Sequence, residues 1–217
     1  MLSISLFEPS QVLIVNLNAH TDYFDSLFDG RDDPWGFKTR WYEQRKRAIT
    51  LAALPRARYA SAYEPGCANG ELSAALADRC DQLLVSDGNA RALSLADARL
   101  AALPHVRVLK AWLPHDWPPG PFDLIVISEV GYYLDAFALG ELADRARQCL
   151  SEHGTVLACH WKAPIEGCAL TGSQVHDQLG QRLDIPHLLR VDDPDFLLDI
   201  WCFDTMSAAQ AEGLRKT

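Results

Sequence analysis

From Tyr59 onward, short apolar runs alternate with segments of strong helix formers, and this alternation constrains the fold more than any other feature of the sequence. The run Phe122–Ser128 (FDLIVIS) is apolar almost throughout, as expected of a strand that is buried on both faces. Helices that alternate with such strands cover both faces of a parallel sheet. The sequence therefore predicts an α/β fold, Rossmann-like, with a seven-stranded, mostly parallel sheet.

The expected elements follow from apolar periodicity and from the turn formers between them. Leu188–Val191 and Phe196–Phe203 are separated by four turn-forming residues, which suit an antiparallel C-terminal hairpin and not a helical crossover. The other predicted strands are Ala60–Glu64, Gln82–Asp87, Val106–Ala111, Phe122–Ser128 and Gly154–Trp161, the last after a turn at His153-Gly154. The predicted helices are Thr39–Leu54, Asn69–Arg79, Ala90–Ala102, Asp135–Leu150 and Thr171–Leu183.

The chain divides into three expected parts. Residues 1–54 form an N-terminal arm and a lid helix, which Thr39 could cap and Pro55 stops. Residues 55–204 form the ligand-binding domain, and residues 205–217 form a mobile or weakly helical tail. Residues 1–20 contain no Lys or Arg, so we expect no secretory signal there.

The charge balance argues against a polyanionic partner. The chain of 217 residues carries 20 Lys and Arg against 29 Asp and Glu, a formal net charge of −9. A protein that neutralises phosphates needs at least a local surplus of cations. The basic stretch Lys38–Arg47, with Trp41, Tyr42 and Ile49 at helical spacing, suits the solvated face of an amphipathic helix better than a nucleic-acid contact. We therefore expect no nucleic-acid partner. The expected oligomeric state is a monomer or a homodimer, which the charge balance does not decide.

The six cysteines are scattered, with no C-x-x-C pair. Neither a metal site nor a disulfide framework is expected from this pattern, and a reducing, cytoplasmic compartment is the simplest fit. No apolar run approaches the roughly 18 residues that a membrane-spanning helix needs, so no membrane partner is expected.

A glycine-containing loop follows the first predicted strand. Glu64 precedes Gly66, and Gly70 opens the next helix, whose N-terminal N–H groups are free to bind a ligand. Glycine lets the backbone approach a ligand closely, although a structural turn would also explain both glycines. The loop has Ala68 where a nicotinamide-binding loop of the form G-x-G-x-x-G has its second glycine.

Two further motifs end predicted strands. Asp87 ends the second strand, where an acid accepts hydrogen bonds from two ribose hydroxyls, although it could instead cap the following helix. Ser128 and Glu129 end the strand Phe122–Ser128 and precede Tyr132 and Tyr133, which could bind a ligand or pack a helix onto the sheet. Because ligands bind at the carboxyl ends of parallel strands, Glu129 and the tyrosines are expected beside the glycine loop.

Together these motifs resemble class I S-adenosylmethionine-dependent methyltransferases. More narrowly, the sequence is similar to the nodulation protein S family over roughly residues 30–203. This similarity rests on Asp33-Pro34-Trp35-Gly36-Phe37, Arg40-Trp41-Tyr42-Glu43, Glu64-Pro65-Gly66-Cys67 and Ser128-Glu129-Val130-Gly131-Tyr132-Tyr133-Leu134. The resemblance implies methyl transfer from S-adenosyl-L-methionine to an amine of a deacetylated chitin-type oligosaccharide or of another small molecule. Ala68 departs from the usual class I loop, where a middle glycine is common.

The resemblance also implies roles for individual residues. The helix after Trp35 is expected to act as a lid, with Arg40 pairing with the methionine carboxylate, although it could simply pack through Trp41 with Arg40 in solvent. The expected cofactor-binding residues are Trp35, Arg40, Glu64, Gly66, Cys67, Ala68, Gly70, Asp87, Trp112, Leu113, Ser128 and Glu129. Expected substrate-binding residues are Tyr132, Tyr133 and Trp161, whose aromatic faces, like that of Trp35, suit a sugar ring.

An amine must be neutral before it attacks the methyl group, so a nearby group must take its proton, directly or through water. The candidates are Glu129 and His160, which end the fourth and fifth predicted strands; His176 is a weaker one. A hydrogen-bonded histidine near the edge of the core remains an equal interpretation of His160. Alignment of the reactants and exclusion of water would supply the rest of the catalysis.

Three other functions compete with this one. The chain could be a small-molecule O-methyltransferase, or a methyltransferase-like module that binds without catalysis. A nicotinamide-dependent oxidoreductase is disfavoured because the sequence has neither G-x-G-x-x-G nor a Tyr-Lys hydride-transfer site.

Overall fold

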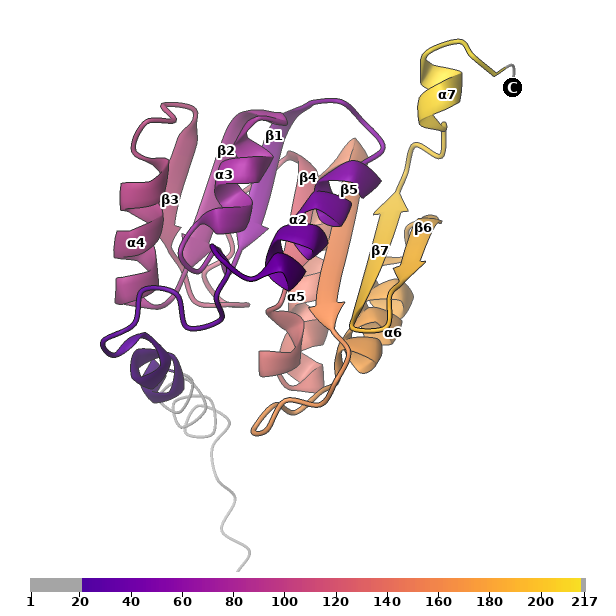
Figure 1. Ribbon diagram of the computed structural model, residues 1–217. Helices are drawn as coiled ribbons and strands as arrows, with labels where there is room; N and C mark the ends of the chain where they lie inside the picture. Colours follow the sequence, from indigo (N-terminus) through magenta and orange to yellow (C-terminus); the bar gives the residue numbers. More distant parts are fainter. Residues whose placement is uncertain (1–20, 216–217) are drawn as a thin grey trace, which may run out of the picture.

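The computed structural model describes residues 21–215, and one seven-stranded sheet organises them. The strand order is β3-β2-β1-β4-β5-β7-β6, and helices cover both faces (Figure 1). The strands are β1 (Tyr59–Pro65), β2 (Cys80–Asp87), β3 (Val106–Lys110), β4 (Phe122–Ser128), β5 (Leu150–Trp161), β6 (His187–Asp192) and β7 (Phe196–Cys202). The helices are α2 (Trp41–Ala53), α3 (Glu71–Ala77), α4 (Ala90–Leu100), α5 (Ala136–Gln148), α6 (Gly172–Leu183) and α7 (Ala208–Ala211), with a 3-10 turn, η1, at Gly131–Tyr133.

The predicted sheet is confirmed. The first five strands pair in parallel, whereas β7 pairs antiparallel with both β5 and β6. β1 lies between β2 and β4, so the chain leaves β1 toward one edge of the sheet and returns to build the other. In an open α/β sheet such a change of direction separates the neighbouring loops and leaves a crevice at the carboxyl ends of the strands.

Alternate residues of β4 face two separate cores. Leu124 and Val126 pack with residues of α3 and α4, whereas Ile125 and Ile127 pack with residues of α5 and α6. Figure 1 shows α2, α3 and α4 in front of the sheet and α5 and α6 behind it. This arrangement explains the unbroken apolar run that marked β4 in the sequence, because a strand covered on both sides has no polar face.

Two local predictions were wrong. α2 begins at Trp41 with Arg40 as its N-cap residue and no capping side chain, so Thr39 does not cap it. The predicted turn at His153-Gly154 lies inside the longer strand β5. The register between β4 and β5 shifts between Phe122 and Leu124. This bulge accommodates the extra residues of β5 that the sequence predicted to form a turn.

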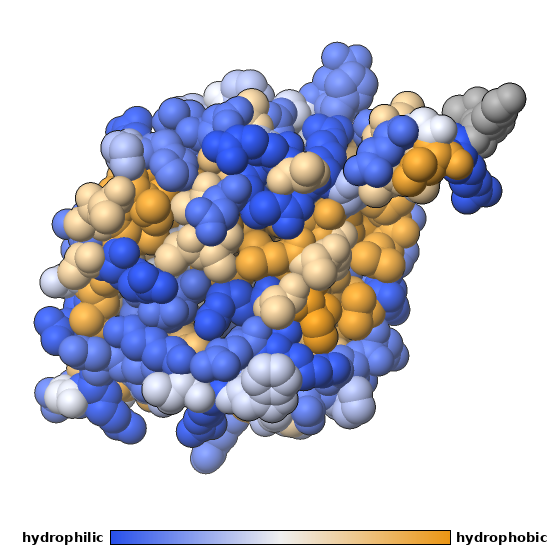
Figure 2. Space-filling model, turned by 45° about the horizontal axis from the view of Figure 1, so that its top comes forward, coloured by the Kyte–Doolittle hydropathy of each residue, from blue (hydrophilic) through white to orange (hydrophobic). Residues whose placement is uncertain are grey.

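The front of the chain contains a helical segment at residues 21–28 that sequence patterns did not predict; the predicted arm at 1–20 lies outside the described residues. This segment lies at the carboxyl ends of the parallel strands, opposite α7 (Figure 1). On the face shown in Figure 2, hydrophilic residues interrupt the apolar areas. Within residues 21–215, no helix has the length and apolar character to cross a bilayer.

Candidate functional site

A cavity of about 600 Å³ opens at the carboxyl ends of β1, β2 and β4. Its floor is made by the loops after these strands, and α2 with the helical residues 21–28 supplies other parts of the wall. The predicted residues that line it are Trp35, Arg40, Glu64, Gly66, Cys67, Ala68, Asp87, Trp112, Leu113, Ser128, Glu129, Tyr132, Tyr133 and Trp161. The structure therefore brings these predicted residues to one cavity, whereas Gly70, His160 and the weaker candidate His176 do not line it.

The glycine loop owes its shape to the strand beside it. The N–H groups of Gly66 and Cys67 both donate to the Ser86 carbonyl, at 2.7 and 2.8 Å. Gly66 has φ +74°, and a Cβ there would lie 2.1 Å from Cγ1 of Val130, so only glycine fits. Ala68 also has a positive φ, +48°, and this left-handed conformation is strained for alanine but not for glycine.

Gly70 has a packing role in this structure. It lies at the N-cap of α3 with φ +79°. A Cβ there would approach Cα of Ala96 to 3.2 Å, so glycine lets α3 pack closely against α4. Gly70 is not on the cavity wall.

Asp87 ties the glycine loop to the end of β2. Its Oδ2 accepts the Ala68 N–H at 3.0 Å, and its Oδ1 accepts the Asn89 N–H at 2.9 Å. Burial raises the pKa of Asp87, and these backbone hydrogen bonds oppose that effect. The helix cap is instead Asn89, whose side chain accepts the Ala92 N–H. Each Asp87 oxygen keeps acceptor capacity for a further donor from a ligand.

Glu64 is a buried carboxyl with spare hydrogen-bonding capacity. Its Oε2 has no hydrogen-bond partner among the described residues, and the side chain lies on the cavity wall. Burial raises the pKa of Glu64 to about 8, Asp87 adds to the rise, and the Ser73 hydroxyl opposes it. A buried polar atom without a partner is rare, and at a cavity wall it is available to a ligand.

Glu129 is held from three sides. Lys46 donates to its Oε1 at 2.6 Å, while the Trp161 N–H, at 3.1 Å, and the Tyr132 hydroxyl donate to its Oε2. Glu129 also has φ +57°, a backbone conformation that is strained for a residue with a side chain. The carboxylate that ends β4 is therefore fixed at the cavity wall.

Sequence patterns missed Lys46, which they placed on a solvated helix face. Its side chain is only 9% exposed, and its ammonium nitrogen lies 3.1 Å from Glu43 as well as bonding Glu129. Burial alone would lower the pKa of Lys46, but the two carboxylates outweigh it and raise the pKa. Lys46 therefore stays protonated between two acids. The one sequence signal was the inward row Glu43, Lys46 and Thr50, polar residues at helical spacing on the buried side of α2.

A second ion pair joins α2 to the end of the chain. Arg45 donates to Oδ2 of Asp193 at 2.7 Å, across 148 residues of sequence. Asp193 lies in the turn between β6 and β7. α2 is thus held over the sheet by both Glu129 and the C-terminal hairpin.

Aromatic side chains make up much of the remaining wall. Tyr42 meets Trp161 edge to face at 5.3 Å, and Tyr132 meets Tyr133 at 4.9 Å between ring centroids. Both pairs lie near Glu129, whose carboxylate bonds the Tyr132 hydroxyl and the Trp161 N–H. Trp35 stacks on Phe37 at 5.3 Å and makes a separate cluster on the wall.

His160 lies behind the cavity wall and is fully buried. Its Nε2 accepts the Gly131 N–H at 3.1 Å, and its Nδ1 lies 3.1 Å from Nε2 of His176, which is also buried. Burial, followed by His176 and Lys46, lowers the pKa of His160 well below its usual value. With both nitrogens engaged, this neutral ring has no free nitrogen that faces the cavity.

Comparison with known proteins places the chain in a family. The family model for nodulation protein S (NodS) matches residues 24–150. Nodulation protein S of Bradyrhizobium diazoefficiens is 36% identical over 104 residues, which cover 48% of this chain and 50% of that protein. The chain thus spans about half the length of the curated relatives it matches.

Solved structures share this fold. A provisionally assigned methyltransferase from Pseudomonas syringae is 54% identical and has a TM-score of 0.69, over 75% of this chain and 99% of that one. The N-methyltransferase NodS from Bradyrhizobium japonicum WM9, in complex with S-adenosyl-l-homocysteine, has a TM-score of 0.77 at 23% identity, over 84% and 97% of the chains. The fold is that of the Rossmann-like methyltransferases. Within this class, the chain belongs to the nodulation protein S family.

Proposed function

We propose that this protein is an S-adenosylmethionine-dependent methyltransferase that methylates an amine of a small molecule or an amino sugar. One observation carries the proposal: the Glu129 carboxylate, flanked by aromatic rings, and the Gly66 loop line the same cavity. The cavity volume of about 600 Å³ falls within the usual range of small-molecule sites. The solved NodS structure, an N-methyltransferase with S-adenosyl-l-homocysteine, supports the choice of cofactor and reaction.

The residues at the Gly66 end fit this cofactor. The backbone approaches the cavity without a Cβ at Gly66, Asp87 offers acceptor capacity to ribose hydroxyls, and Glu64 has an unpaired oxygen for a hydrogen-bond donor. Arg40 and Trp35, which also line the cavity, would complete the enclosure. When bound, the cofactor supplies a methyl group that its sulfonium has already activated. We therefore propose that residues 21–54 act as the lid and residues 55–204 as the binding domain.

The residues at the Glu129 end fit a cationic amine. Glu43, Lys46 and Glu129 together carry one net negative charge, which an incoming ammonium group would balance. Aromatic faces such as those of Tyr132 and Trp161 also attract cations and suit the apolar face of a sugar. Glu129 would hold the amine and take its proton, directly or through water, since its position is fixed by Lys46 and Tyr132. The six unpaired cysteines support a reducing, cytoplasmic compartment.

Calorimetry and a turnover assay test the proposal together. S-adenosylmethionine and S-adenosylhomocysteine should bind, and NAD should not; tight NAD binding would favour an oxidoreductase. Methyl transfer is then measured on deacetylated chitooligosaccharides, small amines, catechols and carboxylates. Turnover confined to oxygen acceptors would show an O-methyltransferase and contradict the proposed amine acceptor. Cofactor binding without turnover on any acceptor would favour a non-catalytic module.

A further inference from the structure

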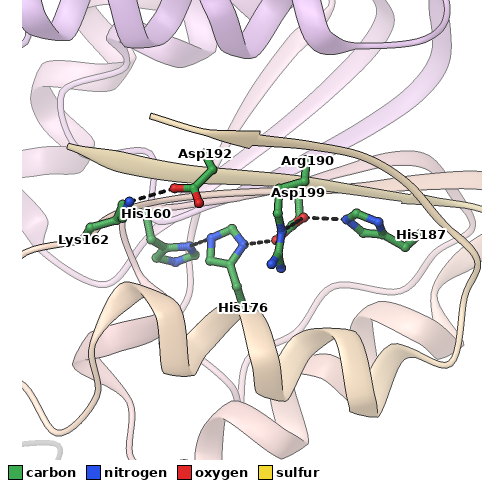
Figure 3. Close-up of polar contacts among 7 residues, drawn as sticks. All are labelled: His160, Lys162, His176, His187, Arg190, Asp192 and Asp199. Atoms are coloured by element: carbon green, nitrogen blue, oxygen red, sulfur yellow. Dashed lines mark hydrogen bonds and ion pairs between the residues drawn. The ribbon is translucent and has the colours of Figure 1, made fainter. Parts of the chain in front are cut away.

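A chain of buried polar side chains runs from His160 on β5 through His176 on α6 to Asp199 on β7 (Figure 3). His160 on β5 meets His176 on α6 at 3.1 Å, and Nδ1 of His176 meets Oδ2 of Asp199 on β7 at 2.7 Å. All three residues are fully buried. None of them lines the cavity, so no role assigned above uses this chain.

The two ends of the chain fix the direction of its hydrogen bonds. The Gly131 N–H can only donate, so Nε2 of His160 must be the acceptor and carry no proton. A neutral His160 then has its proton on Nδ1 and donates it to Nε2 of His176. His176 in turn donates from Nδ1 to the Asp199 carboxylate. The network thus assigns one tautomer to each histidine.

Asp199 anchors the far end as a carboxylate. Arg190 donates to both of its oxygens at 2.8 Å, and Nε2 of His187 lies 2.5 Å from Oδ1. Burial would raise the pKa of Asp199, but hydrogen bonds from His176, Arg190 and His187 hold it well below its usual range. The anchor therefore remains charged, and the chain keeps its direction.

The near end of the chain supports the turn that carries the acceptor-side tyrosines. Gly131 begins η1, and a Cβ at this position would lie 2.5 Å from Val175 on α6 and 3.0 Å from Nε2 of His160. The His160 ring also meets the Tyr132 ring at 5.4 Å between centroids. Because Tyr132 donates to Glu129, the position of His160 sets the geometry of the wall that would face the amine.

We propose that His160, His176 and Asp199 are positioning residues that hold η1, and with it Tyr132 and Glu129, in the geometry that binds the methyl acceptor. This inference rests on the proposed function for its effect on turnover. It assigns His160 to the support of the site and leaves proton removal from the acceptor to Glu129. It also gives a role to the C-terminal hairpin, which supplies the anchor.

A matched pair of substitutions separates this role from a general effect on folding. In His160→Gln the amide oxygen can replace Nε2 and accept the Gly131 N–H. In His160→Asn the shorter side chain keeps the polar contact toward His176 but does not reach Gly131. Thr155→Val, a buried change on the same strand, loses its contact with Cys202 and serves as the control for destabilisation.

Three measurements are made on each variant: hydrogen exchange of the Gly131 amide, calorimetric cofactor affinity, and steady-state kinetics with the best acceptor. His160→Asn should expose the Gly131 amide to exchange and lower kcat/KM for the acceptor about tenfold or more, which is the loss of one buried hydrogen bond, with unchanged cofactor affinity. His160→Gln should restore both properties, and Thr155→Val should lower only the melting temperature.

If the Gly131 amide stayed protected from hydrogen exchange in His160→Asn, the proposal would be overturned. Equal acceptor kinetics in the Asn and Gln variants would also overturn it, because a merely structural histidine would not distinguish them. The proposed function fails separately, when the unmodified protein turns over no acceptor. In that case the exchange measurement, which needs no turnover, still decides whether the chain of side chains supports η1.

Discussion

The ammonium nitrogen of Lys46 lies 2.6 Å from Oε1 of Glu129, and the two residues are 83 positions apart in the sequence. This contact links α2 to the carboxyl end of β4. It joins the segment proposed as a lid to the residue proposed as the base, so changes at Lys46 are expected to affect both stability and catalysis.

Replacing Lys46 with Met should be strongly destabilising. The substitution removes the buried cation and leaves the Glu43 and Glu129 carboxylates close together. Removing one partner of a buried ion pair destabilises a fold by about 3–5 kcal/mol. The pKa of Lys46 is raised in the fold, so its stabilising effect is present at neutral pH and is lost only as the pH rises through the folded-state value. Urea unfolding at pH 7 measures the loss. The exposed Lys38→Met is the control and should change the free energy by less than about 0.5 kcal/mol.

Glu129→Gln should lower turnover of an amine acceptor by about 10²–10⁴-fold. The amide keeps the size of the side chain but cannot take a proton. Rate–pH profiles should lose the limb that reports proton removal. Full activity in Glu129→Gln, measured beside the exposed control Glu152→Gln, would leave catalysis to alignment of the reactants alone.

Asp87→Ala should weaken cofactor binding about tenfold or more, because it removes acceptors for ribose hydroxyls. It also leaves the N–H groups of Ala68 and Asn89 without their partner, so stability should fall by about 1–3 kcal/mol. Calorimetry and thermal unfolding separate the two effects. Asp135→Ala, which removes the cap of α5, should lower stability by about 1 kcal/mol and leave cofactor affinity unchanged. An unchanged dissociation constant in Asp87→Ala would restrict Asp87 to holding the loops.

Glu64→Gln should flatten the pH dependence of stability. The pKa of Glu64 is raised to about 8 in the fold, so the folded state binds more protons than the unfolded state between its ordinary pKa and pH 8. The unmodified protein should therefore lose stability as the pH rises through this range, and the variant should lose less. Urea unfolding from pH 5 to 9 tests this, with Glu152→Gln as the exposed control. Parallel curves for Glu64→Gln and the unmodified protein would contradict it.

Ala68→Gly should stabilise the protein by about 1 kcal/mol. Ala68 has φ +48°, and relief of the left-handed conformation outweighs the extra freedom that glycine gives the unfolded chain. The same substitution at Ala98, exposed in α4, should destabilise by about 1 kcal/mol. Thermal unfolding of the pair should therefore show shifts of opposite sign, and a lowered melting temperature for Ala68→Gly would exclude strain at this loop.

The sheet could be predicted from the sequence because strand signals are local. The bounds of β4 match the apolar run Phe122–Ser128, and parallel pairing follows from the alternation of strands with helices. The Gly66 loop and Glu129 were found for the same reason, since each directly follows a strand. What could not be predicted depends on distant partners. Lys46 is a buried cation only because the folded chain places Glu129 beside it. His160 is turned away from the cavity only because α6 and β7 place His176 and Asp199 behind it.

The ion pair between Arg45 and Asp193 has a consequence for synthesis of the chain. α2 leaves the ribosome long before the hairpin that holds its outer side, since the two partners are 148 positions apart in the sequence. The cavity wall therefore cannot reach its final form cotranslationally until nearly the whole described chain has emerged. A nascent chain that ends before β6 contains the segments of the glycine loop and of β4, but it lacks both the hairpin that holds α2 and the Asp199 anchor. In a series of ribosome-stalled chains of increasing length, affinity for the proposed cofactor should accordingly appear late and abruptly.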